Sequence, residues 1–406
     1  MKVNLSKLVY AFAFTVLFSC SNNENEEVEG PKGAQVSEFI ETYANIASAN
    51  YTDTYETAVE MQSKINAFLT EPTVVRLQEA QNSWLYARDF YGQTEAYREA
   101  NGPIDNEDLL GTEGQINAWP LDEAYIDYVF DASNGGYVNN GLIADDTFQI
   151  TKDNIAAKNE EGKDDNISTG WHAIEFLLWG QDLNYNTTSH TSDNYSVSGL
   201  RTYTDYTTAD YAKRRGEYLS VVTDLLVADL KDLNETWLEG GSYRTTFEAL
   251  DETTALTNIL NGVGFISNGE VALERLDPAI DEGQENEHSC FSDNTTQDMW
   301  ANTNGLNNII VGSYTAENGT TVSGVSLIDI VNEVNESTAI ALENAAKNTI
   351  TQLAVLTGLN KNFDEIISEE TLGSGGPAGL LSSALKAQGT QVSEAATALG
   401  VSITIN

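Results

Sequence analysis

The chain contains very little cysteine, proline and histidine: 2 cysteines, 6 prolines and 3 histidines in 406 residues. If Cys20 is modified, as argued below, Cys290 is the only thiol left, which excludes an internal disulfide. The scarcity of proline permits long helices, because proline breaks a helix interior. Only His172, His190 and His288 can supply imidazole, so each of them can be weighed separately as a site residue. His190 lies in a polar run and is expected to be a solvated loop residue.

Positive charge is also scarce, since 20 Lys and Arg face 62 Asp and Glu, a net charge of −42. Nucleic acids and anionic lipid surfaces are therefore poor partners, because proteins bind both through clustered lysine and arginine. The acidity favours cations as ligands. Most of the carboxylates are nevertheless expected to form a solvated surface that keeps the protein from aggregating.

The N-terminus has the pattern of an export signal. Lys2 and Lys7 precede an apolar run over residues 8–18, and Ser19-Cys20 follows directly. The run is shorter than the roughly 20 residues that span a bilayer as a helix. A small residue followed by cysteine predicts a signal peptide over residues 1–19 and lipidation of Cys20. The alternative is an ordinary secreted protein cut nearby.

Residues 20–33 are expected to form a lipidated acidic tether, because this segment is polar, acidic and free of aromatic residues. The predicted location is the bacterial cell envelope. There the protein would be an outer-membrane-anchored lipoprotein that faces the periplasm or the cell surface, with the N-terminal lipid as its only contact with the membrane.

Long segments of the chain show helical periodicity. The clearest covers residues 209–237, where apolar residues recur every three or four positions from Leu219 to Trp237. Further helices are predicted over residues 36–69, 73–100, 245–276, 322–356 and 377–399. Loops rich in Asn, Asp, Gly, Ser and Thr are expected over residues 131–166 and 183–207, and the glycine-rich residues 373–379 are expected to be an interhelical loop.

The predicted fold class is therefore all-α, with two bundle-like helical domains. The length of the chain favours two domains, each large enough for its own core. The predicted domains are an N-terminal bundle over residues 34–205 and a C-terminal bundle over residues 206–406.

His172 and Glu175 form the most informative polar pair. Their spacing of three residues places both side chains on one helix face, where they could hold Fe, Mn or Zn, or act as an oriented acid and base. The alternative is an amphipathic turn in which the two side chains hydrogen-bond to each other. Because residues 171–179 are otherwise almost entirely apolar, the pair is expected to be buried and to need polar partners.

Two further segments could supply such partners. Residues 285–298 are dense in metal-capable side chains and include His288, with Ser292 and Asp293 as alternative caps of the following helix. Residues 84–98 place Arg88 and Glu95 two turns apart on one helix face. For residues 84–98 two interpretations are equally compatible with the sequence: ion pairs on a helix around a core tryptophan, or a part of the functional site.

At these three segments the chain resembles the imelysin family of bacterial envelope proteins. The resemblance rests on Gly170-Trp-His172-Ala-Ile-Glu175, on residues 285–295 (ENEHSCFSDNT) and on residues 84–98. It implies a helical fold of two bundle-like domains with the signature His and Glu near their interface, and a link to iron uptake. The implied site residues are Gly170, His172, Glu175, Ser292, Asp293, Glu95 and Arg98.

The resemblance has one departure. Thr296-Gln297 stands where a further histidine is expected, which weakens the expectation of a histidine-rich metal site. The family is also catalogued as a metallopeptidase family.

The function expected from the sequence is iron acquisition, by binding iron or an iron-containing ligand through His172 and Glu175, with His288 as the other available imidazole. Zinc is less expected, because a catalytic zinc needs three protein ligands and the His-Glu-x-x-His helix is absent. The first alternative is a metal-dependent peptidase that uses His172, Glu175 and His288, with Glu287 or Asp293 as base. The second is a non-catalytic partner-docking module. An envelope transporter is a possible partner for the binding protein.

Overall fold

The computed structural model describes residues 33–131, 133, 135–182, 185–186, 191–192 and 198–405. The predicted signal peptide, Cys20, nearly all of the tether and His190 lie outside the described residues. Within the described part no helix is long and apolar enough to cross a membrane.

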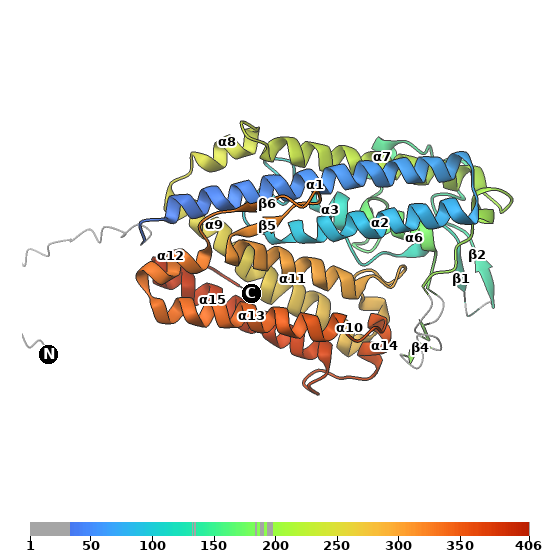
Figure 1. Ribbon diagram of the computed structural model, residues 1–406. Coiled ribbons are helices and arrows are strands. Elements are labelled where there is room, and N and C mark those ends of the chain that lie inside the picture. The colour runs from blue at the N-terminus through green and yellow to red at the C-terminus, as the bar shows by residue number, and fades with distance from the viewer. Residues whose placement is uncertain are drawn as a thin grey trace, which may run out of the picture.

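Three long helices run side by side along one edge of the molecule (Figure 1). They are α1 (Val36–Thr70), α2 (Val74–Thr94) and α7 (Ala212–Trp237). The short turn between α1 and α2 makes them antiparallel, and the Thr73 hydroxyl caps α2 by accepting the Arg76 N–H at 3.3 Å. The apolar stripe predicted for α7 is buried from Leu219 to Trp237, where it faces α1.

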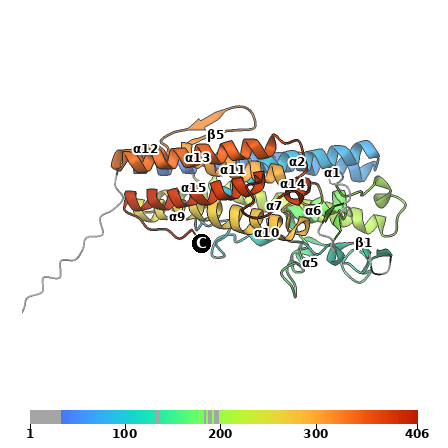
Figure 2. The same cartoon turned by 90° about the horizontal axis from the view of Figure 1, so that it is seen from below.

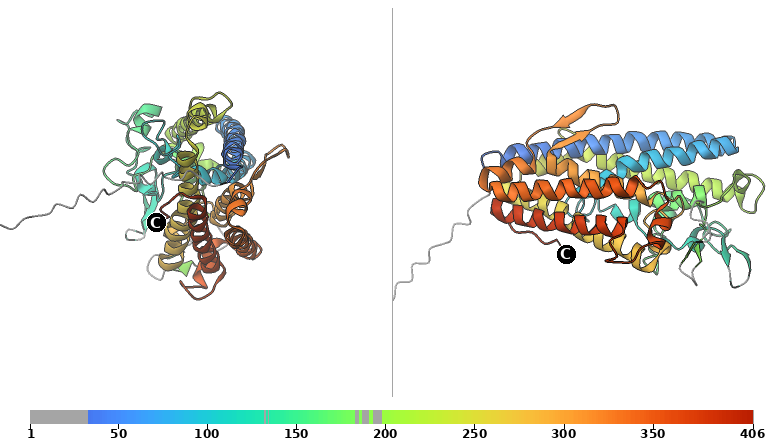
Figure 3. Two further views of the ribbon diagram at one scale, coloured as in Figure 1. Left: turned by 90° about the vertical axis from the view of Figure 1, so that its left-hand side faces the viewer. Right: turned by 60° about the horizontal axis from the view of Figure 1, so that its bottom comes forward.

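A second group of long helices lies beside the first (Figures 2 and 3). It consists of α9 (Glu252–Phe265), the π-helical η3 (Ile266–Leu276), α13 (Glu336–Thr357) and α15 (Pro377–Leu399). The helix α11 (Thr295–Val311) joins the two groups, because it packs on α2 on one side and on α13 on the other.

The remaining elements are short. The helices are η1 (Glu95–Tyr97), α3 (Glu113–Asn117), α4 (Glu123–Ile126), α5 (Lys152–Ala156), α6 (Gly170–Trp179), η2 (Tyr203–Tyr206), α8 (Ser242–Glu248), α10 (Asp277–Glu282), η4 (Gln284–Asn286), α12 (Leu327–Val334) and α14 (Phe363–Ser368). Among the described residues the strands form three antiparallel pairs: β1 (Val129–Asp131) with β2 (Gly136–Val138), β3 (Tyr185–Asn186) with β4 (Thr191–Ser192), and β5 (Ser313–Thr315) with β6 (Thr321–Ser323).

The predicted helices differ from the observed ones where a capping side chain starts a new helix. The prediction for 377–399 matches α15, whereas that for 245–276 is interrupted before α9, where Asp251 accepts the Thr254 N–H. The prediction for 322–356 is wrong at its start, which is strand β6. It is also broken between α12 and α13, where Asn335 caps α13. A capping side chain satisfies the free N–H groups in the first turn of a new helix. Such a cap leaves the apolar periodicity unchanged, so a prediction from periodicity misses the break between two helices.

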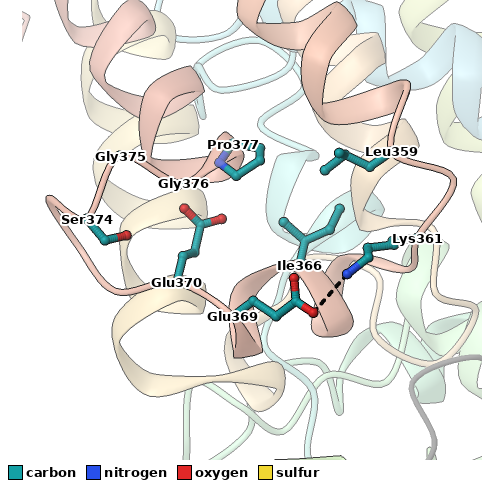
Figure 4. A pocket seen from close by; sticks show the side chains of 9 residues that line it. All are labelled: Leu359, Lys361, Ile366, Glu369, Glu370, Ser374, Gly375, Gly376 and Pro377. Atoms are coloured by element: carbon teal, nitrogen blue, oxygen red, sulfur yellow. Dashed lines mark hydrogen bonds and ion pairs between the residues drawn. The ribbon is translucent and has the colours of Figure 1, made fainter.

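Of the loop predicted over residues 373–379, residues 373–376 lie between helices, whereas residues 377–379 form the start of α15. The pocket beside this loop, of about 360 Å³, is drawn in Figure 4. The Glu370 carboxylate turns into the start of α15 and accepts the N–H groups of Ala378 at 3.0 Å and Gly379 at 3.1 Å. The chain thereby supplies its own anion at this helix N-terminus.

The all-α class is confirmed, since the only strands in the described part of the chain are short pairs among the helices. The buried apolar side chains of the described residues form one continuous cluster from Val36 to Val401. The division at residue 205 stays a prediction. α7 follows that position in the sequence and packs on α1 and α6, which precede it.

Candidate functional site

The signature helix α6 begins at a glycine for a steric reason. Gly170 has φ +80°, and a Cβ atom there would lie 2.3 Å from the carbonyl oxygen of Ile116. Only glycine tolerates both the left-handed backbone and this close approach. All ten residues of α6 are buried, so His172 and Glu175 lie inside the protein, as the apolar neighbours predicted.

His172 and Glu175 hydrogen-bond to each other, with Nδ1 of His172 2.9 Å from Oε2 of Glu175. The other carboxylate oxygen, Oε1, accepts the Ser292 N–H at 3.0 Å and the Ser292 hydroxyl at 2.7 Å. Burial raises the pKa of Glu175 to about 8, although the hydrogen bond from Ser292 lowers it. The pair thus meets Ser292, which follows Glu175 by 117 residues in the sequence.

A second imidazole–carboxylate pair lies against the first. Nδ1 of His288 is 2.8 Å from Oδ2 of Asp298, and the His172 and His288 rings meet edge to face with centroids 4.9 Å apart. One atom of Arg88, Nη2, lies 3.4 Å from Nε2 of His172. It is almost equally far from both ring nitrogens of His288, 3.3 Å from Nε2 and 3.4 Å from Nδ1. The same guanidinium nitrogen therefore contacts both imidazoles.

The protonation of the two rings follows from these contacts. Arg88 can only donate hydrogen bonds, so Nε2 of His172 accepts and the proton of this ring lies on Nδ1, facing Glu175. In His288 the proton also lies on Nδ1, because the ionised Asp298 beside that nitrogen can only accept. Burial and Arg88 lower the pKa of His172 well below its ordinary value, and burial and Arg275 lower that of His288 to about 4. Although burial raises the pKa of Asp298, Arg88 and His288 hold it well below its usual range. Both imidazoles are neutral at neutral pH.

Aromatic rings hold Arg88 in place. Its guanidinium lies 5.2 Å from the Tyr91 ring, 5.8 Å from Trp171 and 5.9 Å from Trp84, distances typical of cation–π contacts. Its Nε donates to Oδ1 of Asp298 at 3.1 Å. We refer to Arg88, His172, Glu175, His288 and Asp298 as the signature centre. All five side chains are at most 2% exposed.

Glu95 and Arg98 belong to a neighbouring charge network and do not touch His172. Arg98 pairs with Glu95 at 3.2 Å, and Arg275 from η3 also binds Glu95. Asn117 connects this network to the signature centre, since it accepts from Arg88 and its Nδ2 donates to Glu95 at 3.4 Å. Arg98 and Arg275 lower the pKa of Glu95 to about 2 against the effect of burial.

Asp293 lies beside the signature centre and faces other acids. Its Oδ2 accepts from Asn362 at 2.7 Å, and burial and Asp364 raise its pKa to about 8. The helix that follows, α11, has Asn294 as its N-cap residue, so the alternative that Ser292 or Asp293 caps it is wrong. Oε1 of the buried Glu287 has no hydrogen-bond partner among the described residues.

Among the described residues no three His, Cys, Asp or Glu side chains are arranged to hold a metal ion. The reason at the signature centre is visible in the contacts: His172 and Glu175 bind each other, and Arg88 lies within 3.4 Å of a nitrogen of each imidazole. Gln297, at the position where histidine was expected, hydrogen-bonds to Asp89.

Sequence reasoning missed part of this centre. Asp298 lies within the acidic segment but was not singled out, and Arg88 was noted without being assigned to the site. Asn117 offers no signal in the sequence, because only the fold brings it to Arg88.

Comparisons with known proteins agree with the fold and with the family resemblance. The family model described as imelysin matches residues 47–397. Iron-regulated protein A of Synechococcus elongatus is 32% identical over 73 residues, a match that spans 18% of this chain and 19% of that protein. A crystal structure from Parabacteroides distasonis, described as a candidate iron-regulated protein A precursor, superposes with a TM-score of 0.67. It is 18% identical and covers 91% of this chain and 96% of the other. Because the family model matches most of its length, the chain belongs to the imelysin family.

Proposed function

We propose that this protein is an envelope-anchored lipoprotein that binds iron at the signature centre and takes part in iron acquisition. The observation that carries the proposal is the convergence of two carboxylate-oriented imidazoles, His172 and His288, on the single nitrogen Nη2 of Arg88. The names of the relatives, which are iron-regulated proteins, support a connection to iron.

The side chains of the centre are of the right chemical types for iron. Neutral imidazole is a common iron ligand, and a ligating histidine characteristically donates its other N–H to a carboxylate, as His172 does to Glu175 and His288 to Asp298. Arg88 occupies the shared point as a built-in cation. Iron would therefore bind by exchange, with the guanidinium leaving and the metal taking its place between the two Nε2 atoms.

The peptidase alternative is less well supported by the geometry. It needs three ligands that face one metal and a water with a base beside it. Of its three proposed ligands, Glu175 is already engaged by Ser292 and by Nδ1 of His172, so it faces away from the point shared by His172 and His288. A well-folded preparation that cleaves unfolded protein in a metal-dependent manner would favour the peptidase over the binding protein.

The test is an iron titration of the mature protein, followed by metal analysis after desalting. We expect the wild type to retain iron, and the His172→Ala Glu175→Ala double variant to lose it. Glu336→Ala, which removes an exposed carboxylate on α13, serves as the matched control and should retain iron. Equal iron in the wild type and the double variant, both folded by circular dichroism, would count against this site.

The anchoring part of the proposal is tested separately. Lipidation at Cys20 would place the protein in the membrane fraction through its N-terminal lipid, from where it would pass iron to an envelope transporter. We expect Cys20→Ser to move the protein into the soluble envelope fraction and to abolish labelling by a fatty-acid analogue. An unchanged distribution and unchanged labelling would contradict the lipoprotein assignment.

A further inference from the structure

The helix α2 has a second face, which the signature centre does not use. Arg88 and Tyr91 lie on its inner face and are buried toward the centre. Other residues of α2, spaced by three and four positions, lie on a different face and line a cleft. They are Tyr86, Asp89, Phe90 and Gln93.

The cleft lies between α2 and α11 and is closed at one end by the β5–β6 hairpin. Its volume of about 510 Å³ is within the range of small-molecule binding sites, roughly 300 to 1,000 Å³. We call it the α2–α11 cleft. It is built from residues close to, but distinct from, those of the signature centre.

Aromatic side chains form part of the lining. Tyr86 is 45% exposed, and its ring meets that of Phe90 edge to face with centroids 5.3 Å apart. Trp300 of α11 is half-buried and lines the same cleft. Such exposed rings offer flat apolar surface beside polar groups.

Side-chain amides form much of the rest. Asn304 donates to the Trp300 carbonyl at 2.8 Å, and Asn308 donates to Oε1 of Gln93 at 3.0 Å. These bonds use the amide nitrogens and fix the amide planes. For Asn307 the described residues provide no side-chain partner. An amide group both donates and accepts, which matches a hydroxyl group, since a hydroxyl does the same.

Two acids complete the lining. Oδ1 of Asp89 is buried without a hydrogen-bond partner among the described residues, so it needs a donor that the protein does not supply there. Burial raises the pKa of Asp89 to about 6, and a hydrogen bond with Gln297 lowers it. Oε1 of Glu317 accepts the Tyr86 hydroxyl at 2.9 Å. The lining contains no lysine or arginine.

The hairpin wall of the cleft is held by Asp53 of α1. Its Oδ2 accepts the Tyr314 hydroxyl at 2.6 Å and the Glu317 N–H at 2.9 Å. Tyr314 is 1% exposed, so the hairpin is anchored in the core. The cleft is therefore largely formed before a ligand arrives, which lowers the entropic cost of binding.

We infer that the α2–α11 cleft binds a neutral oligosaccharide. Sugar rings would stack on Trp300 and Phe90, and their hydroxyls would bond to the amides and to Asp89. An apolar ligand would leave the Asn307 amide and Oδ1 of Asp89 unpaired, which is costly. An anionic ligand would meet the two acids and the net charge of −42. Hydroxyl-rich, uncharged chemistry satisfies all these groups together.

The test uses the full mature protein with maltotriose, cellotriose and triacetylchitotriose as neutral probes and trigalacturonate as the anionic one. Binding is followed by saturation-transfer NMR and by isothermal titration. We expect a neutral trisaccharide to bind. Trp300→Ala should weaken its affinity about ten-fold and Asn307→Ala about five-fold, through lost stacking and a lost hydrogen bond.

Tyr137→Ala is the matched control, because Tyr137 is 63% exposed on β2, away from the cleft, and its removal should leave the affinity unchanged. Asn307 is only half-buried, so its variant keeps the test valid if Trp300→Ala does not fold. The inference is overturned if no neutral trisaccharide binds the folded wild type at millimolar concentration. It is also overturned if affinity persists in both cleft variants, or if trigalacturonate binds more tightly than the neutral probes.

Discussion

At the scale of single residues, the centre consists of charges that are buried but mutually compensated. Asp298 accepts hydrogen bonds from Nε of Arg88, Nδ1 of His288 and the Ser289 hydroxyl. Sequence reasoning found His172, Glu175 and Ser292, because short motifs and scarce histidine are visible along the chain. It could not find that Arg88 contacts both imidazoles, since His172 and His288 follow Arg88 by 84 and 200 residues in the sequence.

Asp298→Asn should therefore be strongly destabilising. The substitution removes the negative charge opposite Arg88 and leaves a buried guanidinium without its counter-ion, a loss of about 4 kcal/mol in the free energy of unfolding. Urea denaturation measures it. The control is Glu343→Gln, which breaks the exposed pair with Lys347, in which both side chains are more than 40% exposed, and should leave the midpoint nearly unchanged. Equal midpoints for the two variants would show that the buried charge pair is not as described.

At the scale of elements, the position of α6 depends on one close backbone contact. Gly170, the first residue of α6, lies against Ile116 of α3. This contact fixes the start of α6 and thereby the positions of His172 and Glu175. The long helices could be predicted from periodicity because each buries one stripe. The short elements could not be predicted, since the hairpins and α3 to α5 have too few residues for a period and are stabilised by contacts distant in sequence.

Gly170→Ala tests this contact, and Gly240→Ala is its control. Gly240 has a similar φ but free space around it. Gly240 has φ +77°, and a methyl group added there would have no atom within 4 Å, whereas at Gly170 that group would lie 2.3 Å from a carbonyl oxygen. We expect Gly240→Ala to cost about 1 kcal/mol, from the left-handed backbone alone. Gly170→Ala should cost at least about 2 kcal/mol more, from the added clash. Similar thermal midpoints for the two variants would refute the steric role.

At the scale of the whole molecule, the excess of acid has a consequence for stability, because several carboxyl groups are partly or fully buried. Burial raises the pKa of Glu123 to about 7 and that of Asp364 to about 7. A carboxyl whose pKa is raised on folding stabilises the fold at low pH, and this stabilisation is lost as the pH rises through the folded value. The buried histidines act in the opposite direction, but only below about pH 6.5, where an unfolded histidine gains its proton.

Between about pH 6.5 and about 8.5, the change of stability with pH therefore reports the buried carboxyl groups without a contribution from the buried histidines. We expect the thermal midpoint of the wild type to fall across this window. In Glu123→Gln it should fall less, because the neutral side chain has no proton to lose. Glu107→Gln, at an exposed position, is the control and should follow the wild type. A Glu123→Gln midpoint with the wild-type pH dependence would contradict the buried-carboxyl account.

The most direct measurement of the central claim is anomalous diffraction at the iron edge from crystals of the iron-loaded protein. The account predicts an iron peak within bonding distance of Nε2 of both His172 and His288, about 2.1 Å, with the Arg88 guanidinium displaced from its place between them. An iron peak elsewhere, with Arg88 still between the two imidazoles, would contradict it.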